Sequence, residues 1–146
     1  MSQYELDFTI SSPADSVAFL DFSSNGRFLA VGGRGPASLH VLDRLTGFHP
    51  IVSSITPAEP TAIVWETSKT FYVGFEDGRF ADYRIDLAEN RLVAGITNNF
   101  FHGAFPITAM ALDAEFETLV LSVGPEICMF RRVHVTGTSL PMGWGQ

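Results

Sequence analysis

Short apolar runs alternate with polar turns along most of the chain. Three of them, "SVAFLDF" (16–22), "TAIVWET" (61–67) and "ITAMALD" (107–113), begin alike, and their aligned alanines are 44 and 47 residues apart. Further apolar runs follow after polar turns: 27–33, 38–43 and 49–55 in the first unit, 70–76, 79–86 and 91–97 in the second, and 118–124 and 126–133 in the third. These runs are rich in β-branched and aromatic residues and are bounded by Gly, Asn, Asp and Pro, so each predicts a strand. The pattern predicts an all-β chain with an internal repeat.

The repeat defines the expected organisation of the chain. We expect three units, over residues 16–55, 61–97 and 107–133, with four antiparallel strands in a complete unit. The third unit lacks a clear fourth run, because residues 134–146 are Gly- and Pro-rich and predict an irregular tail. At the other end, "YELDFTI" (4–10) looks like the outer strand of a preceding unit.

Three stretches sharpen the strand interpretation. "FLAVGG" (28–33) is apolar at consecutive positions, which predicts a strand buried on both faces. "DLAENRLVAG" (86–95) is also compatible with a helix, but its charged half falls where a hairpin turn is expected, so the hairpin is favoured. Trp65 lies in the first strand of the second unit, and we expect it to pack between neighbouring units.

Three passages resemble WD40 repeats. "FSSNGRFLAVGG" (22–33) resembles the turn that precedes the second strand of a WD40 blade. "FEDGRFADYRID" (75–86) is similar to the passage linking the second and third strands, and "HGAFPITAMAL" (102–112) to the entry into a new blade. The resemblance implies a WD40-like β-propeller fragment of about three four-stranded antiparallel blades within residues 1–133.

The sequence departs from the WD40 pattern in two ways. No Trp-Asp dipeptide is present, and other pairs stand in its place: Leu42-Asp43, Ile85-Asp86 and Phe130-Arg131. The family's tetrad of Asp, His, Ser and Trp is matched only by Asp77 in the second unit and His102 in the third. Since no unit holds the full set, we do not expect the tetrad's hydrogen-bond network.

Three blades are too few to close a ring, since closed propellers typically use about four to eight. Two apolar blade faces would then be exposed. The chain is therefore expected to be part of a longer propeller, or to close by association, for example as two chains in one ring. A β-sandwich or barrel is the third alternative. The composition favours the first two, because 46% of the residues are apolar, only 17% are charged, and mean hydropathy is +0.18.

The glycines of "VGGRGP" (31–36) fit either a phosphate cradle or a tight turn. A phosphate cradle needs a helix after the glycines and a Lys-Ser or Lys-Thr pair. Here Pro36 and another strand-like run follow, and that pair is absent, so we predict a turn. Hairpin turns that require positive φ are expected at two further pairs: Asn25-Gly26 and Asp77-Gly78. The Asp77 side chain is also expected to accept from the amides of its own turn.

Charge, cysteine content and hydropathy indicate which partners and which cellular compartment to expect. The net charge is −7, and the nine Lys and Arg residues are scattered, so no basic stripe predicts nucleic-acid binding. Cys128 is the single cysteine, which excludes an internal disulfide and fits a structural thiol in a reducing compartment. No apolar run approaches the roughly 20 residues that span a bilayer, and the N-terminus does not resemble a signal peptide. We expect no membrane association and a cytoplasmic location, with the nucleus as an alternative.

No pattern typical of catalysis is present in the sequence. The four histidines do not have paired metal-ligand spacing, and the G-x-S-x-G motif of serine hydrolases is missing. Nothing marks any two carboxylates as a catalytic pair. The sequence therefore predicts a protein that is not an enzyme and holds neither a cofactor nor a metal.

By resemblance, the expected function is that of a scaffold or adaptor that binds protein or peptide partners through the loops of one propeller face. The candidate partner-binding residues are Arg34, Pro36, Glu76, Phe100, Phe101, His102 and Phe105. Arg and aromatic residues are frequent anchors of interfaces, although core packing at a blade junction explains the phenylalanines at least as well. Two alternatives stay open: a blade set that completes a larger propeller or complex, and an enzyme or small-molecule site in the channel.

Overall fold

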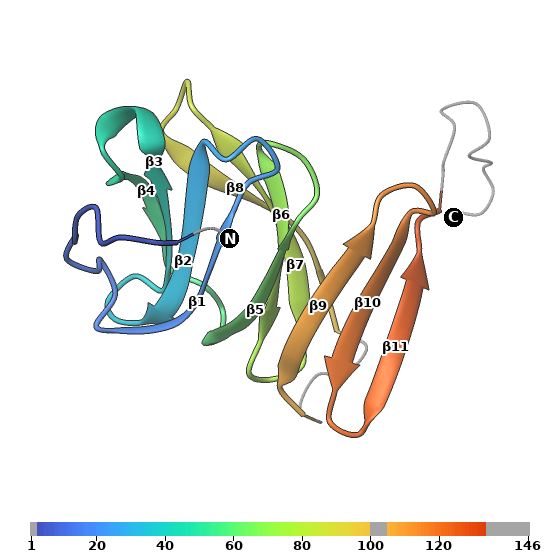
Figure 1. Ribbon diagram of the computed structural model, residues 1–146. Coiled ribbons are helices and arrows are strands. Elements are labelled where there is room, and N and C mark those ends of the chain that lie inside the picture. Colours follow the sequence, from blue (N-terminus) through green and yellow to red (C-terminus); the bar gives the residue numbers. More distant parts are fainter. Residues whose placement is uncertain (1–2, 100–104, 134–146) are drawn as a thin grey trace.

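The computed structural model describes residues 3–99 and 105–133, which form three antiparallel sheets (Figure 1). Sheet 1 has the order β1 (Ser16–Phe22), β2 (Phe28–Arg34), β3 (Leu39–Asp43), β4 (His49–Ser54), with one turn of 3-10 helix at Arg44–Thr46. Sheet 2 has the order β5 (Pro60–Trp65), β6 (Thr70–Phe75), β7 (Phe80–Asp86), β8 (Arg91–Asn98). Sheet 3 consists of β9 (Ile107–Asp113), β10 (Thr118–Val123) and β11 (Glu126–Arg131), in the order β11-β10-β9.

The sheets follow one another along the chain like blades. Within each sheet, every strand pairs with the next strand of the chain. We call the first strand of each sheet, β1, β5 and β9, its inner strand. β5 contacts both β1 and β9, so sheet 2 sits between sheets 1 and 3 (Figure 1). This arrangement confirms the predicted all-β class and the predicted four-stranded units, and residues 86–95 form the predicted hairpin rather than a helix. Within the described residues, sheet 3 has three strands, as its missing fourth apolar run predicted.

Sheets 1 and 2 share the larger hydrophobic core. Its members from sheet 1 are Phe28, Ala30, Leu39, Val41 and Val52, and its members from sheet 2 are Trp65, Phe71, Val73, Phe75, Ala81, Tyr83 and Ile85. A smaller core between sheets 2 and 3 contains Ala62, Phe80, Ile107, Leu119, Leu121 and Val123. Burial of apolar area between sheets, at about 25 cal/mol per Å², is the main force that holds the blades together.

Trp65 joins the first two sheets. Its indole Nε1 donates a hydrogen bond of 3.0 Å to the backbone oxygen of Asp21 in β1, and its ring lies 4.6 Å from that of Phe71. The side chain is 9% exposed. The predicted packing of Trp65 between units is confirmed.

The glycine-rich stretch forms the predicted turn. β2 ends at Arg34, Gly35 has φ +147, and the Gly33 N–H donates to the Ser38 oxygen at 3.0 Å before strand β3 begins. Gly33 also faces a bulge in β1, where an added Cβ would lie 1.9 Å from the Ser16 backbone oxygen. The glycine is required because the two backbones approach closely, so steric fit between β1 and β2 explains this position.

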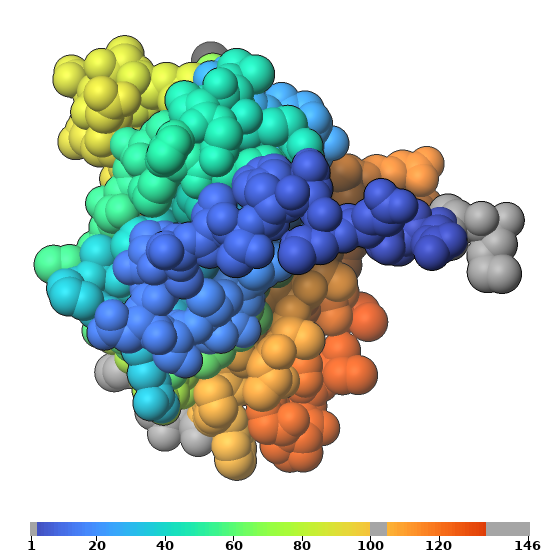
Figure 2. Space-filling view, turned by 60° about the vertical axis from the view of Figure 1, so that its left-hand side comes forward, coloured from blue at the N-terminus to red at the C-terminus, as the bar shows by residue number. Residues whose placement is uncertain are grey.

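Residues 4–10 do not form a strand in this chain. They lie extended and exposed on the outside of the molecule, coloured dark blue in Figure 2. A strand needs a neighbouring strand for its backbone N–H and C=O groups, and none of the described strands pairs with this segment. The place of this segment as the outer strand of a preceding blade therefore stays a prediction. In the described part of the chain, no helix has the length and apolarity to cross a membrane.

Candidate functional site

Three connections meet at one edge of sheets 1 and 2, and we call them the loop face: residues 35–38 between β2 and β3, 55–59 between β4 and β5, and 76–79 between β6 and β7. Backbone hydrogen bonds hold the connections together. The Glu76 N–H donates to the Glu59 oxygen at 2.9 Å, and the Thr56 N–H donates to Ser38 Oγ at 3.1 Å. The loop face is therefore built from neighbouring blades and fixed by main-chain contacts.

The loop face contains a shallow hollow of about 260 Å³. It is lined by Gly33, Arg34, Gly35, Pro36, Ser38, Ile55, Thr56, Ala58 and Glu59. Arg34 Nε donates to Glu59 Oε1 at 3.0 Å, while the Arg34 side chain remains 72% exposed. Ile55 is 80% exposed beside it. The hollow thus combines a positive guanidinium with an exposed aliphatic side chain on a fixed backbone.

The structure brings some of the predicted binding residues together. Arg34 and Pro36 line the hollow, and Glu76 is exposed on the neighbouring connection. Phe105 is 50% exposed, and its ring covers Gly124 in the turn between β10 and β11. The remaining candidates, Phe100, Phe101 and His102, lie outside the described residues.

The predicted turn residues lie at two different edges. Asn25 and Gly26 form the β1–β2 turn, where Asn25 Oδ1 accepts from the Arg27 N–H at 3.1 Å and Gly26 has φ 75. Asp77 and Gly78 belong to the loop face. Asp77 Oδ1 accepts from the Arg79 N–H at 3.1 Å, Asp77 Oδ2 accepts from Arg79 Nε at 2.7 Å, and Gly78 has φ 88. Both acceptor side chains stabilise the turns in which they lie.

Ile55 and Glu59 also line the hollow and were not predicted from the sequence. Both lie in the connection from the outer strand of sheet 1 to the inner strand of sheet 2, on the same edge as the "VGGRGP" turn. The loops of one propeller face were expected to bind partners, but no residue of this connection was singled out. The ion pair itself spans 25 residues of sequence, so no local pattern indicates it.

Two buried polar groups in sheet 1 are structural. His40 is 4% exposed; its Nε2 lies 3.0 Å from the Ala37 oxygen, to which it donates, and its Nδ1 accepts from Ser53 Oγ at 2.7 Å. Burial lowers the pKa of His40, although the bond to Ala37 opposes this, so the ring is neutral. Asp43, also 4% exposed, accepts two bonds from the Arg27 guanidinium at 3.1 and 3.0 Å, and these lower its pKa.

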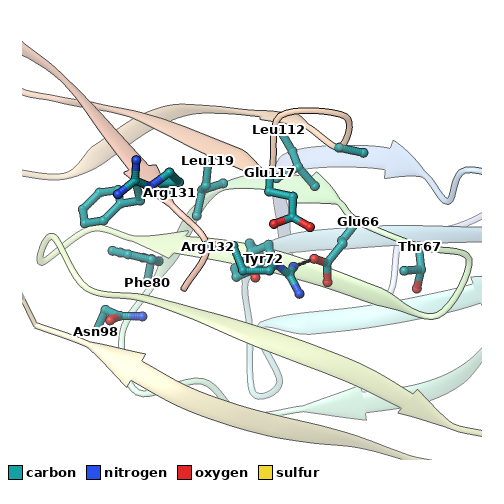
Figure 3. Close-up of a pocket in the computed structure, with 12 residues that line it drawn as sticks. Glu66, Thr67, Tyr72, Phe80, Asn98, Leu112, Glu117, Leu119, Arg131 and Arg132 are labelled. Atoms are coloured by element: carbon teal, nitrogen blue, oxygen red, sulfur yellow. Dashed lines mark ion pairs between the residues drawn. The ribbon is translucent and has the colours of Figure 1, made fainter. Parts of the chain in front are cut away.

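A larger cleft of about 640 Å³ lies between sheets 2 and 3 (Figure 3). Tyr72 and Phe80 lie on the sheet 2 side, and the Arg132 guanidinium points to the Glu66 carboxylate, with which it forms an ion pair. Glu117 lies beside this pair. Burial, and then the negative charge of Asp82, raises the pKa of Tyr72, which keeps its hydroxyl protonated. The charged groups of the cleft thus join the two sheets.

The described residues contain no group of three or more His, Cys, Asp or Glu side chains arranged to hold a metal ion. The carboxylates of Asp43, Glu59 and Asp77 accept from arginines or turn amides, and the buried His40 is bonded through both ring nitrogens. The loop face presents both charge and apolar area to solvent.

Comparisons with known proteins report on the fold. No protein-family model matches the chain, and no curated protein matches it. Among solved structures, it is similar to a chain of the "Mitotic Checkpoint Complex", with a TM-score of 0.68, 17% identity, and coverage of 86% of this chain and 40% of that one. It is also similar to the "C-Terminal WD40 Domain Of Sif2" (TM-score 0.60, 10% identity, 77% and 32% coverage) and to the "computationally designed Ika4 protein" (0.57, 18%, 79% and 65%). The chain thus spans less than two thirds of the length of each.

Proposed function

We propose that this chain, which has a WD40-like propeller fold, is a non-catalytic scaffold that binds a protein or peptide partner through the loop face. The observation that carries the proposal is the hollow in which Arg34 and Ile55 stand exposed beside Glu59. Such folds commonly serve protein interaction, and one of the similar structures is a protein complex. A cytoplasmic location and the absence of nucleic-acid binding stay predictions.

The chemistry of the hollow favours an acidic partner segment that carries an aliphatic side chain. A guanidinium has five N–H donors in a planar fork, and the bond to Glu59 uses one of them. An exposed ion pair of this kind contributes only about 0–1 kcal/mol, so a partner carboxylate can replace Glu59 at little cost. Ile55 then supplies apolar area next to the charge.

A peptide library displayed on phage tests the proposal. We expect selection against the wild-type chain to enrich acidic peptides containing Leu, Ile or Val, and Arg34→Glu to weaken their binding about tenfold or more, as for loss of an interface anchor. Arg91→Glu is the matched control, because Arg91 is similarly exposed but lies at the opposite edge of sheet 2. Binding should be measured by fluorescence anisotropy with synthetic peptides.

The outcomes separate the loop face from other surfaces. Loss of binding in Arg34→Glu and in Ile55→Ser, with binding retained in Arg91→Glu, supports the proposal. Equal binding by all three variants contradicts it. A rise in melting temperature with a nucleotide or sugar would instead favour a small-molecule site in the channel, the alternative function considered above.

A second candidate function is supported by the coverage of the similar structures. The match covers 40% of the chain from the mitotic checkpoint complex and 32% of the Sif2 domain, which supports a correspondence to part of a larger propeller. We infer that the chain can also serve as a blade set that completes such an assembly.

A further inference from the structure

The Asn25-Gly26 pair in the turn between β1 and β2 is chemically labile as well as structural. It is the single Asn-Gly pair of the sequence, and asparagine is among the thermolabile residues of proteins. Glycine has no Cβ to shield its backbone nitrogen, and a Cβ placed on Gly26 would meet nothing within 4 Å. Asn25 itself is exposed. The turn therefore combines a side-chain amide with an unhindered backbone nitrogen that can attack it.

The reaction open to this pair is deamidation through a cyclic imide. The backbone nitrogen of Gly26 gives up its proton to hydroxide and forms a bond to Asn25 Cγ, and the side-chain nitrogen takes a proton from water and leaves as ammonia. Water then adds to one of the two imide carbonyls. Opening at Cγ gives an aspartate, whereas opening at the main-chain carbonyl gives an isoaspartate, in which the side-chain carbons become part of the backbone. Either product carries a negative charge where the asparagine was neutral.

The folded turn holds both reacting groups in hydrogen bonds. The Gly26 N–H donates to the Ser23 backbone oxygen at 2.9 Å, so the attacking nitrogen keeps its proton in a bond. Asn25 Oδ1 accepts from Ser23 Oγ at 2.8 Å and from the Arg27 N–H at 3.1 Å. Ring closure requires the Gly26 nitrogen to release its bond and the side-chain amide to leave its two donors. The closed turn therefore opposes the reaction.

Ser23 ties this turn to the buried part of sheet 1. It is 4% exposed, and its Oγ donates to Asn25 while it accepts from the Phe28 N–H at 3.0 Å. On the other side of the turn, Arg44 Nε donates to the Gly26 oxygen at 2.9 Å. Because Ser23 is buried, a bond broken there is not readily replaced by a bond to water, and breaking it is costly. The turn should therefore open only together with this end of the β1–β2 hairpin.

We propose that Asn25 is a site of spontaneous deamidation, and that the closed β1–β2 turn suppresses the reaction until this end of sheet 1 opens. The rate in the folded protein is then the rate in the open chain multiplied by the fraction of time that the turn is open. Loss of ammonia makes the change permanent. Position 25 thus keeps a chemical record of local opening in sheet 1.

The two products should differ in their effect on the turn. An aspartate at position 25 keeps an oxygen that can accept from Ser23 Oγ and from the Arg27 N–H. An isoaspartate lengthens the main chain of the turn by a methylene group and so displaces the Gly26 N–H from the Ser23 oxygen. We expect Asn25→Asp to melt at the temperature of the wild type or above it, and the isoaspartate form, separated from aged protein by chromatography, to melt lower.

Peptide mapping by mass spectrometry measures the reaction in the full chain. Tryptic residues 1–27 contain Asn25 as their one asparagine, and residues 85–91 contain only Asn90. Asn90 is the matched control, because it is also exposed in a turn but is followed by Arg91, whose side chain hinders attack by its nitrogen. In urea, Asn25 should deamidate faster than Asn90. In buffer at the same pH and temperature, the Asn25 rate should fall about tenfold or more, since reaction then requires local opening.

Two neighbouring serine variants test whether the turn gives this protection. Ser23→Ala removes the hydroxyl that donates to Asn25, and should speed the reaction in the folded chain about threefold to tenfold, as loss of one hydrogen bond predicts. Ser24→Ala makes the same change at the adjacent exposed position and should leave the rate unchanged. In urea, both variants should react like the wild type.

The outcomes of these measurements are distinct. Slower reaction in the folded wild type, with acceleration by Ser23→Ala and not by Ser24→Ala, supports the proposal. Equal rates in buffer and in urea overturn it, and so do equal rates of the two folded serine variants. The comparison of folded and unfolded wild type needs no substitution, so the proposal is tested even where Ser23→Ala does not fold.

Discussion

β3 and β11 occupy the same place in their sheets, yet their environments are opposite. Every residue of β3 is buried, whereas four of the six residues of β11 are exposed and the other two are half-buried. The second strands differ in the same way. β2 is buried at consecutive positions, while β10 alternates between buried and half-buried residues. Sheets 1 and 3 each share one hydrophobic core with sheet 2.

This difference shows that burial in this fold depends on a strand's neighbours within its own sheet more than on its composition, because β3 lies between β2 and β4, whereas β10 is the one described strand that pairs with β11. "LHVLD" and "EICMF" have similar numbers of apolar residues, and only the first is covered on both sides. β11 therefore has the composition of a buried strand and the exposure of a surface strand. Substitutions should have different costs in the two places.

The largest contrast is expected between Trp65 and Met129. Trp65→Ala removes the indole between sheets 1 and 2 together with its bond to Asp21, and should lower the free energy of unfolding by about 3–5 kcal/mol. Met129→Ala should change it by about 0.5 kcal/mol or less, because Met129 is 73% exposed. Urea denaturation of both variants provides the measurement. Equal costs would contradict the difference between the two sheets.

A smaller contrast is expected between Gly33 in sheet 1 and Gly124 in sheet 3. Gly33→Ala forces a Cβ against the backbone of β1 and should cost about 1–3 kcal/mol, typical of overpacking. Gly124→Ala meets the side chain of Phe105, which is half exposed and can turn away, so the main cost is the positive φ of 56, about 1–2 kcal/mol. Thermal melts compare the two. A larger loss for Gly124→Ala would show that sheet 3 is the more rigid.

The smallest effect expected is a pH dependence that arises in sheet 1. Burial holds the pKa of His40 below its ordinary value of 6.5, so the unfolded chain binds a proton that the folded chain does not. Stability therefore falls as the pH drops from 6.5 toward the folded pKa, and above 6.5 this group has no effect. His40→Gln should flatten that part of the curve of melting temperature against pH. An unchanged curve would show that His40 does not titrate on unfolding.

The fold was predictable because its signals are local. Turn pairs such as Asn25-Gly26 and apolar runs such as "FLAVGG" placed the strands to within about two residues, and the repeat indicated how the sheets follow one another. Only part of the hollow on the loop face was predictable from the sequence. Arg34 and Pro36 stand in a recognisable turn, but Glu59 is 25 residues away from Arg34 and meets it only after β3 and β4 return the chain to this edge. The Arg27–Asp43 ion pair also joins residues far apart in the sequence, which meet only when β2 pairs with β3.

Sheet 2 is the one sheet of the described chain with a neighbour on each face. In such a row, stability is approximately the sum of each unit and its contacts with adjacent units. The central sheet then gains from two contacts and each end sheet from one. Local opening should begin at the outer sheets, and the backbone amides of β6, whose Val73 and Phe75 are fully buried, should exchange with solvent last. The molecule thus carries a gradient of cooperativity that is highest in the middle of the chain and lowest near its two ends.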